Sequence, residues 1–227
     1  MKKKLIIFDC DGVLVDSEYI ASRIFSEALL SYGYTISTEE SIKRFTGVNE
    51  HDARQMILNE ASINIPENYW ALEQPKLHKA YETELTSLML PVLEMLDILE
   101  LPRCVASNSS RSHVANCLKL SQQSTYFAER AIFTSQQVKK PKPAPDLFLF
   151  AASEMGFKPE ECIVVEDSAT GAQAAVAAGM DVLVFLGGSH ASHEWYRSHI
   201  AHYGKPIVSS CQELLEAIFQ ALNSNID

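Results

Sequence analysis

The sequence lacks the uninterrupted apolar run of about 18 to 20 residues that a membrane-spanning helix requires. The lysines at positions 2–4 precede only four apolar residues before Asp9, too few for the apolar core of a secretory signal. Internal repeats and low-complexity tracts are also absent from the sequence, and its ordinary composition, 47% hydrophobic and 21% charged, excludes a disordered tail protein, a collagen and a coiled-coil rod. We therefore expect a globular protein of the cytoplasm that has no membrane partner.

Cysteine is scarce, and its spacing excludes the common cysteine-based sites. The five cysteines occupy positions 10, 104, 117, 162 and 211, and no Cys-x-x-Cys pair is among them. Such a pair is typical of redox-active and zinc-binding proteins. Most of these cysteines adjoin apolar runs, so we expect buried, reduced thiols and no disulfide bonds.

Basic residues are also fewer than acidic residues. Nineteen Lys and Arg residues against 29 Asp and Glu residues give a formal net charge of −10. A surface of that sign repels phosphate backbones, so we expect no nucleic-acid partner. The sequence contains no motif of the nucleotide P-loop, the dinucleotide-binding fold or the serine-hydrolase elbow.

Short apolar runs, by contrast, alternate with helical patterns along most of the chain. They are too continuous for half-exposed antiparallel strands and are typical of strands covered on both faces of a sheet. The predicted strands span residues 5–8, 104–106, 131–133, 163–165, 182–186 and 207–208. Between and after them, segments 147–155, 169–178 and 214–222 have helical spacing or high helix propensity. This alternation predicts an α/β fold with a doubly wound, Rossmann-like parallel sheet.

Residues 16–85 interrupt the alternation. Apolar residues at helical spacing between positions 20 and 29 predict a helix, further helical patterns follow, and we find no strand pattern. Pro75 indicates a kink or a helix boundary. We therefore divide the chain into an α/β core domain, residues 1–15 and 86–227, and a smaller all-helical domain, residues 16–85, inserted after the first strand. Its position near the ligand-binding edge of a doubly wound sheet predicts a cap.

Polar residues follow several of the predicted strands at their carboxyl ends. In a parallel sheet these ends meet at one edge, so the residues are expected to lie close together. They are Asp9 and Asp11 after the first strand, Ser107 and Asn108 after the second, Lys142 in the loop after the third, and Glu166 and Asp167 after the fourth.

Such a concentration of carboxylates needs a counter-charge, because like charges at close range raise one another's pKa values. Oxygen ligands in small number suit Mg²⁺, whose remaining ligands are waters and substrate phosphate oxygens. The ammonium of Lys142 and the hydroxyl of Ser107 would bind further phosphate oxygens. The sequence therefore favours a phosphoryl group as the ligand of this edge.

These segments resemble the four signatures of the haloacid dehalogenase (HAD) superfamily, in the same order. The matching segments are DCDGVLVDS from Asp9, SNS from Ser107, KPAPD from Lys142 and EDS from Glu166. The helical insert has the position of the cap in the branch that contains β-phosphoglucomutase, phosphoglycolate phosphatase and related sugar-phosphate phosphatases. The resemblance covers the core domain from end to end and implies the fold of that superfamily.

The resemblance implies a Mg²⁺-dependent phosphatase whose partner is a small phosphorylated metabolite, either a sugar phosphate or a sugar-acid phosphate. It also implies a role for each matching residue. Asp9 would be the nucleophile that forms a phosphoaspartate, and Asp11 would be the general acid that then becomes the base. Ser107 and Lys142 would hold the phosphoryl group, with Asn108 as a further substrate contact.

The same resemblance implies the metal ligands. Asp167 would bind Mg²⁺ together with Asp9 and the backbone carbonyl of Asp11. Glu166 would contact the ion directly or through a water molecule. By analogy with the family we expect a monomer.

The alternative to a phosphatase is a phosphosugar mutase, and at one position this sequence differs from the mutase pattern. The mutase of this branch carries a cap arginine shortly after a Gly-Val step, and that arginine grips a second phosphate. Here the Gly-Val step at positions 47–48 is followed by Glu50 at the corresponding place. A carboxylate cannot hold a phosphate, so hydrolysis is favoured, unless Lys43, Arg44 or Arg54 compensates. A metabolite-binding protein without catalysis is a third, more distant interpretation.

Four histidines cluster near the C-terminus, at positions 190, 193, 199 and 202. Their spacing is not that of a zinc-protease helix. We interpret them as part of a solvated loop and helix face, and we assign them no role in the site.

Overall fold

The chain forms two compact units in a computed structural model, which describes residues 3–46, 48, 50–203 and 206–223. The core unit comprises Met1–Asp16 with Thr86–Asp227, and the helical unit comprises Ser17–Leu85. Among the described residues, none of the helices is both long enough and apolar enough to cross a bilayer.

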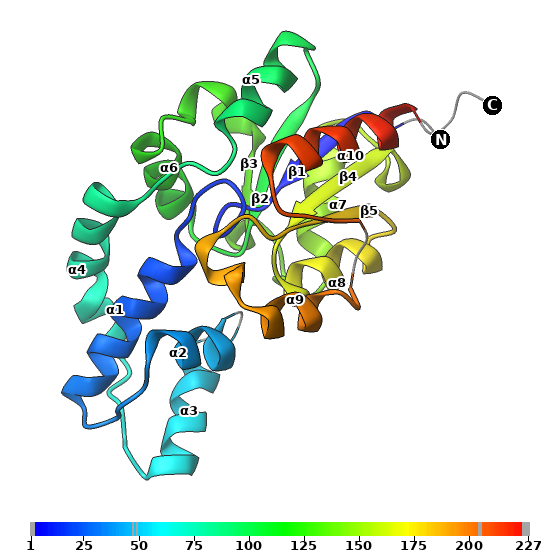
Figure 1. Cartoon of the computed structure of the whole chain (residues 1–227). Helices are drawn as coiled ribbons and strands as arrows, with labels where there is room; N and C mark the ends of the chain where they lie inside the picture. Colours follow the sequence, from blue (N-terminus) through cyan, green and yellow to red (C-terminus); the bar gives the residue numbers. More distant parts are fainter. Residues whose placement is uncertain (1–2, 47, 49, 204–205, 224–227) are drawn as a thin grey trace. The chain divides into compact units, whose positions relative to one another are not determined.

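The core unit is built on a six-stranded parallel sheet (Figure 1). Its strands are β1 (Leu5–Phe8), β2 (Arg103–Ser107), β3 (Ile132–Thr134), β4 (Cys162–Glu166), β5 (Asp181–Phe185) and β6 (Ile207–Val208). They lie in the order β3-β2-β1-β4-β5-β6, which confirms the doubly wound sheet expected from the sequence. All six predicted strands are present. The central strands β1 and β4 are buried along their whole length, which explains their continuous apolar sequences.

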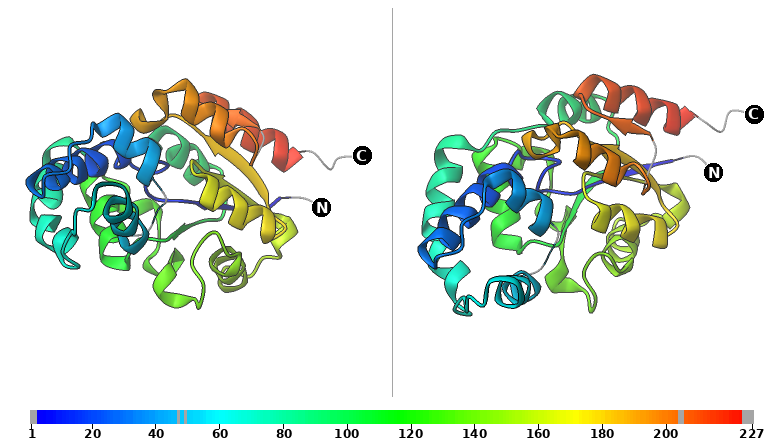
Figure 2. Two further views of the ribbon diagram at one scale, coloured as in Figure 1. Left: turned by 90° about the horizontal axis from the view of Figure 1, so that it is seen from below. Right: turned by 60° about the horizontal axis from the view of Figure 1, so that its bottom comes forward.

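Helices connect the strands and cover the sheet on both sides. In chain order they are α5 (Leu90–Ile98), α6 (Arg111–Leu120), α7 (Asp146–Glu154), α8 (Ala169–Ala177), α9 (Glu194–Ile200) and α10 (Cys211–Asn223). Helix α10 packs on α5, and α7 packs on α8. Right-handed crossovers place these two pairs on opposite faces, and Figure 2 shows α10 and α7 on the two sides of β1.

Strand register brings the ends of β1, β2 and β4 level. Phe8 pairs with Val105 of β2 and with Val165 of β4. Asp9, directly after β1, and Glu166, the last residue of β4, therefore emerge at the same edge. This carboxyl edge is where doubly wound sheets bind their ligands.

The helical unit consists of α1 (Glu18–Ser31), α2 (Thr38–Phe45), α3 (Glu50–Ala61) and α4 (Tyr69–Glu84). These helices and the loops between them share a hydrophobic cluster of their own. Its buried members are Phe25, Leu29, Tyr34, Phe45, Ala53, Ile57, Ile65 and Tyr69. A separate core of this kind is typical of a domain.

Helix α4 continues through Pro75, so a helix boundary at that proline is wrong. Proline removes the N–H that would bond to the carbonyl of residue 71. The helix persists because Tyr69 on one side of the proline, and Leu77 and Tyr81 on the other, are buried. Burial of three large side chains outweighs the loss of one hydrogen bond.

The cysteines are free thiols, as the sequence predicts. Cys10, Cys104, Cys117 and Cys162 are buried, and Cys211 is half-buried. Two of the buried thiols, Cys10 and Cys117, lie near the polar residues at the carboxyl edge of the sheet.

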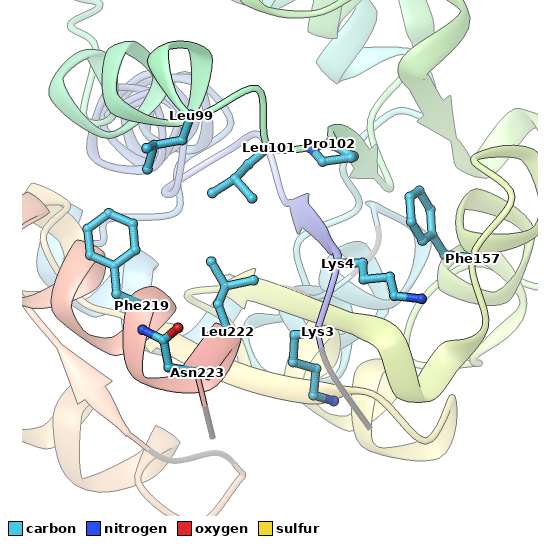
Figure 3. A pocket seen from close by; sticks show the side chains of 9 residues that line it. All are labelled: Lys3, Lys4, Leu99, Leu101, Pro102, Phe157, Phe219, Leu222 and Asn223. Carbon is cyan, nitrogen blue, oxygen red and sulfur yellow. The ribbon is translucent and has the colours of Figure 1, made fainter. Parts of the chain in front are cut away.

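A pocket of about 500 Å³ lies at the opposite edge of the sheet (Figure 3). Lys3 borders it just before β1 and Pro102 just before β2, so it opens at the amino ends of the strands. Leu101 and Leu222 give it apolar walls. This pocket is therefore separate from the edge at which Asp9 emerges.

Candidate active site

Lys142 joins two carboxylates at the carboxyl edge of the sheet. Its Nζ donates hydrogen bonds to Oδ1 of Asp9 and to Oε1 of Glu166, each at 2.7 Å. The ammonium also lies 4.6 Å from the ring centroid of Phe148 on α7, in a cation–π contact. The side chains of Lys142 and Glu166 are only 3% and 1% exposed, so water screens these charges little. The loop after β3 thus delivers a buried positive charge to the ends of β1 and β4.

Burial and neighbouring charge shift the pKa values of this group. Burial disfavours the charged ammonium of Lys142, but the carboxylates of Asp9 and Glu166 outweigh burial and raise the lysine pKa. Burial raises the pKa of Asp9 well above its ordinary value, Lys142 lowers it, and Glu166 and Asp167 raise it further. Burial, followed by the charge of Glu166, likewise raises the pKa of Asp167. Burial and neighbouring carboxylates therefore disfavour the ionised forms of Asp9 and Asp167, and the charge of Lys142 offsets this only in part.

The carboxylate of Glu166 is fixed by the turn that begins α8. Its Oε2 accepts hydrogen bonds from the N–H groups of Asp167 and Ser168 at 3.0 Å and from the Ser168 hydroxyl at 2.9 Å. Ser168 also caps α8 by accepting a hydrogen bond from the N–H of Gly171 at 3.0 Å. A Cβ at Gly171 would overlap Oε1 of Glu166. Glycine is therefore needed at this position for the carboxylate to lie against the first turn of the helix.

Gly171→Ala is expected to destabilise the protein, although alanine normally favours a helix over glycine by about 0.5–1 kcal/mol. The new methyl group would overlap the buried carboxylate of Glu166, and overpacking of this kind costs about 1–3 kcal/mol. Chemical denaturation measures the change in the free energy of unfolding. In a Glu166→Ala background the overlap is gone, and the same substitution is expected to stabilise. Equal destabilisation in both backgrounds would contradict this account of the glycine.

Asp167 lies beside a buried histidine. Nε2 of His190 is 2.8 Å from Oδ2 of Asp167, and His190 is fully buried. The interpretation of His190 as part of a solvated loop is therefore wrong, although His199 and His202 are exposed as expected. Gly12, with a φ of +77°, leaves room for the carboxylate, since a Cβ there would overlap Oδ2 of Asp167.

The carboxylate of Asp11 is held by two side chains from the segment after β2. Ser109 donates its hydroxyl hydrogen to Oδ2 at 2.7 Å, and Nε2 of His113 lies 2.9 Å from Oδ1. The charge of Asp11 is the main cause that raises the pKa of His113, to about 11. The sequence motifs did not include His113. Its position in the first turn of the helix that follows Ser107 is the signal that could have identified it.

Two thiols lie next to this histidine. Sγ of Cys117, one helical turn further along α6, is 3.5 Å from Nε2 of His113. A hydrogen bond with Cys10 is the main cause that lowers the pKa of Cys117, to about 7, while burial opposes this shift. The same hydrogen bond and burial raise the pKa of Cys10 well above its ordinary value. Cys10, although it lies between two aspartates of the motif, is therefore a poor nucleophile.

Ser107 and Asn108 differ in what their side chains bind. Ser107 is buried, and its Oγ accepts a hydrogen bond from the N–H of Ser109 at 3.1 Å, so its hydroxyl hydrogen can still be donated. The Asn108 amide bonds the backbone of Lys142 at both ends. Nδ2 donates to the Lys142 carbonyl at 3.1 Å, and Oδ1 accepts from the Lys142 N–H at 3.0 Å. Asn108 thus fixes the loop that carries the lysine.

Three carboxylates form a group with the donor chemistry of a cation site. One oxygen each from Asp9, Glu166 and Asp167 lie within 4.8 Å of one another, and all three residues are buried. Hard oxygen donors are the ligands that Mg²⁺ prefers. Burial is the main cause that raises the pKa values of Asp9 and Asp167, and the neighbouring carboxylates add to it, so a divalent cation at this place would stabilise the ionised forms. The residues present therefore fit Mg²⁺.

Known proteins share this sequence pattern. Residues 6–185 match the family model of the haloacid dehalogenase-like hydrolases. The chain is 31% identical over 189 residues to 6-phosphogluconate phosphatase of Escherichia coli K12, an alignment that covers 82% of this chain and 83% of that protein. It is 32% identical over 181 residues to fructose-1-phosphate phosphatase YqaB of the same strain, with 78% and 94% of the two chains covered.

Solved structures share the fold. The conserved haloacid dehalogenase-like protein of unknown function ATU0790, from Agrobacterium tumefaciens C58, superposes with a TM-score of 0.85 at 35% identity over 97% of this chain and 99% of that chain. A HAD family hydrolase from Deinococcus radiodurans R1, solved with bound phosphate and sodium, gives a TM-score of 0.79 at 27% identity, with 97% and 96% covered. The family match runs from β1 to β5 and includes Asp9, Lys142 and Asp167. The chain belongs to the haloacid dehalogenase-like hydrolase family, as its four sequence motifs predict.

Proposed function

We propose that the protein is a Mg²⁺-dependent phosphatase that hydrolyses a small phosphorylated metabolite. The observation that carries this proposal is the buried group in which Lys142 bridges Asp9 and Glu166, with Asp167 beside them. Phosphoryl transfer can use a carboxylate as nucleophile, an ammonium to bind phosphate, and carboxylate oxygens to bind a cation. This edge of the sheet carries all three.

In the first half-reaction, Asp9 is the nucleophile. One of its carboxylate oxygens attacks phosphorus, the bond between phosphorus and the leaving oxygen breaks, and a phosphoaspartate forms. Asp11 donates a proton to the leaving oxygen, so the product departs as an alcohol. Ser109 and His113 orient Asp11, because they contact its two carboxylate oxygens.

In the second half-reaction, Asp11 acts as the base. It takes a proton from a water molecule whose oxygen attacks the phosphorus, the bond to Asp9 breaks, and inorganic phosphate is released. Lys142 and Ser107 hold the phosphoryl oxygens in both steps, the lysine as a positive charge and the serine as a hydrogen-bond donor. Asn108 contributes by fixing the backbone of Lys142.

We assign the cation to Asp9, Asp167 and the backbone carbonyl of Asp11, with Glu166 acting directly or through a water molecule. When bound, Mg²⁺ would neutralise charge on these carboxylates and on the phosphoryl oxygens. Glu166 also positions Lys142, from whose Nζ it accepts a hydrogen bond at 2.7 Å. His190 orients Asp167 from a distance of 2.8 Å.

The related proteins support a carbohydrate-derived substrate. Two of them are named for activity on 6-phosphogluconate and on fructose 1-phosphate, a sugar-acid phosphate and a sugar phosphate. The related hydrolase from D. radiodurans binds phosphate together with a cation, sodium. We therefore propose a sugar phosphate or a sugar-acid phosphate as the substrate of this chain.

We further propose that residues 16–85 act as a cap that excludes water while the phosphoryl group is transferred. The separate hydrophobic cluster of the helical unit supports this division, because a cap must keep its own structure when it moves. We also propose that the enzyme works as a monomer in the cytoplasm.

The helical unit favours hydrolysis over the alternative, a phosphosugar mutase. Glu50, the first residue of α3, stands where a mutase would have an arginine that binds phosphate. Positions 47 and 49, which belong to the same motif, lie outside the described residues. Arg44 forms an ion pair with Glu60, and Arg54 donates a hydrogen bond to a backbone carbonyl at 2.8 Å. Both arginines are thus engaged within the helical unit.

Phosphate release from p-nitrophenyl phosphate, 6-phosphogluconate and fructose 1-phosphate tests the proposed function. We expect turnover with Mg²⁺, loss of turnover to background with EDTA, and recovery when excess Mg²⁺ is added. Turnover that survives EDTA would exclude this mechanism. Conversion of β-glucose 1-phosphate into glucose 6-phosphate with little free phosphate would favour the mutase. Absence of turnover on a broad panel of phosphate esters would favour a metabolite-binding protein without catalysis.

A further inference from the structure

A second group of potential metal ligands adjoins the proposed active site, and its donors are chemically different. The group consists of Asp11, His113 and Cys117. Their ligand atoms, a carboxylate oxygen, a ring nitrogen and a sulfur respectively, lie within 4.8 Å of one another. His113 and Cys117 are four residues apart on α6 and so lie on the same face of that helix. Cys117 is buried, whereas the side chains of Asp11 and His113 are 16% and 20% exposed. A cation can therefore reach the group from solvent.

The distances within this group are close to those of a tetrahedral zinc site. Zinc–sulfur and zinc–nitrogen bonds of about 2.3 and 2.05 Å, at the tetrahedral angle, place the two ligand atoms about 3.6 Å apart. The observed separation between Nε2 of His113 and Sγ of Cys117 is 3.5 Å. Oδ1 of Asp11 lies 2.9 Å from the same nitrogen, against about 3.3 Å in a zinc site. A small outward shift of the Asp11 side chain would complete the geometry.

The donor set also separates this group from the three carboxylates beside Lys142. A thiolate, an imidazole and a carboxylate are ligands typical of zinc, with water in the fourth position. Mg²⁺ takes oxygen ligands and has little affinity for thiolate, so the thiol selects a softer cation than the one that the carboxylates prefer. Binding displaces one proton from Sγ of Cys117 and one from the His113 ring, and both protons pass to solvent.

We propose that Asp11, His113 and Cys117 form an inhibitory binding site for zinc or a zinc-like transition-metal cation. The bound cation takes up the carboxylate that serves as general acid and base, and so removes it from proton transfer. The site itself stands on its three donors, whereas its effect on turnover rests on the proposed phosphatase function.

Titration of the whole chain with Co²⁺ in saturating Mg²⁺ tests the site directly, because Co²⁺ bound to a thiolate has a near-ultraviolet charge-transfer band. We expect the band to saturate at about one equivalent and to be displaced by Zn²⁺. Cys117→Ser removes the band, and Cys117→Ala is a second variant in case serine disturbs the buried position. Cys211→Ser, which changes a thiol outside the group, keeps the band.

Phosphate release in Mg²⁺ gives the second measurement. We expect Zn²⁺ to inhibit the unchanged protein, and excess Mg²⁺ not to relieve this inhibition. Cys117→Ser retains Mg²⁺-dependent turnover but needs at least about tenfold more Zn²⁺ for half-inhibition, because it has lost a ligand. Cys211→Ser is inhibited like the unchanged protein.

The proposal would be overturned by a band of unchanged intensity in Cys117→Ser, or by inhibition that Mg²⁺ reverses. In either case the cation would occupy other ligands. A cysteine-dependent band in a protein that releases no phosphate would support the site and count against the proposed function. Phosphate release by a protein without the band would support the function and refute the site.

Discussion

Asp9→Asn is expected to lower phosphate release on the order of 10⁵-fold, to below detection. Asparagine keeps the shape of the side chain, but its amide is too weak a nucleophile to form the covalent intermediate. Loss of the nucleophile from a cooperating catalytic group costs on the order of 10⁶ in kcat in a serine protease. The measurement is kcat on p-nitrophenyl phosphate, together with the retention of radiolabelled phosphate on the acid-quenched protein.

Two controls separate this chemical effect from a folding defect. Asp146→Asn makes the same substitution at the start of α7, within a matching motif, and is expected to leave turnover nearly unchanged. Asp9→Asn itself is expected to fold, because it removes a buried charge that Glu166 and Asp167 repel. Its amide oxygen can still accept a hydrogen bond from Lys142. A kcat within about tenfold of the unchanged protein would contradict the assignment of Asp9 as the nucleophile.

The sheet could be predicted from the sequence because both of its faces are covered. A strand buried on both faces is a continuous apolar run, as in Leu5–Phe8 and in most of Cys162–Glu166. Parallel connections then require the loops after these strands to meet at one edge. The short distances from Lys142 to Asp9 and Glu166 follow from this topology and not from any local pattern.

His190 and His113 escaped the sequence motifs for different reasons. His190 follows β5 in a short 3-10 helix, Ser189–Ser192, beyond the carboxyl end of that strand. The rule that the carboxyl ends of parallel strands meet at one edge would therefore have selected it. Its burial against Asp167 depends on tertiary packing that the spacing of the histidines does not encode. His113 lies within α6, and the start of that helix at its cap, Ser110, directs the ring toward Asp11.

Pro75 and Asn108 show where local rules give way to tertiary contacts. A proline ends most helices, yet α4 continues because its buried side chains stabilise it more than the lost hydrogen bond destabilises it. The motif around Asn108 implies a contact with the phosphoryl group. In the folded chain both ends of its amide bond the backbone of Lys142, 34 residues away in sequence. A partner so distant cannot be read from the motif alone.

Lys142→Ala is expected to lower kcat by about 10²–10³, because it removes a preorganised positive charge from the point where phosphoryl transfer develops negative charge. The side chain is 3% exposed, so water cannot fully replace the ammonium. Lys142→Arg is not expected to restore activity, because the planar guanidinium does not fit a buried position shaped for an ammonium. Lys140→Ala, at an exposed lysine of the same loop, is the matched control and is expected to turn over normally.

The Mg²⁺ dependence of Lys142→Ala separates loss of charge from loss of structure. Without the ammonium, Asp9, Glu166 and Asp167 attract a cation more strongly, so the Mg²⁺ concentration at half-maximal turnover is expected to fall while kcat falls. The metal-free variant also loses the partner of a buried ion pair, which costs about 3–5 kcal/mol. Without Mg²⁺, the variant is therefore expected to have a lower Tm than the unchanged protein. Addition of Mg²⁺ is expected to raise the Tm of the variant by more than it raises that of the unchanged protein. If the Mg²⁺ dependence and the Tm both stay unchanged, Lys142 does not belong to the charge network that holds the cation.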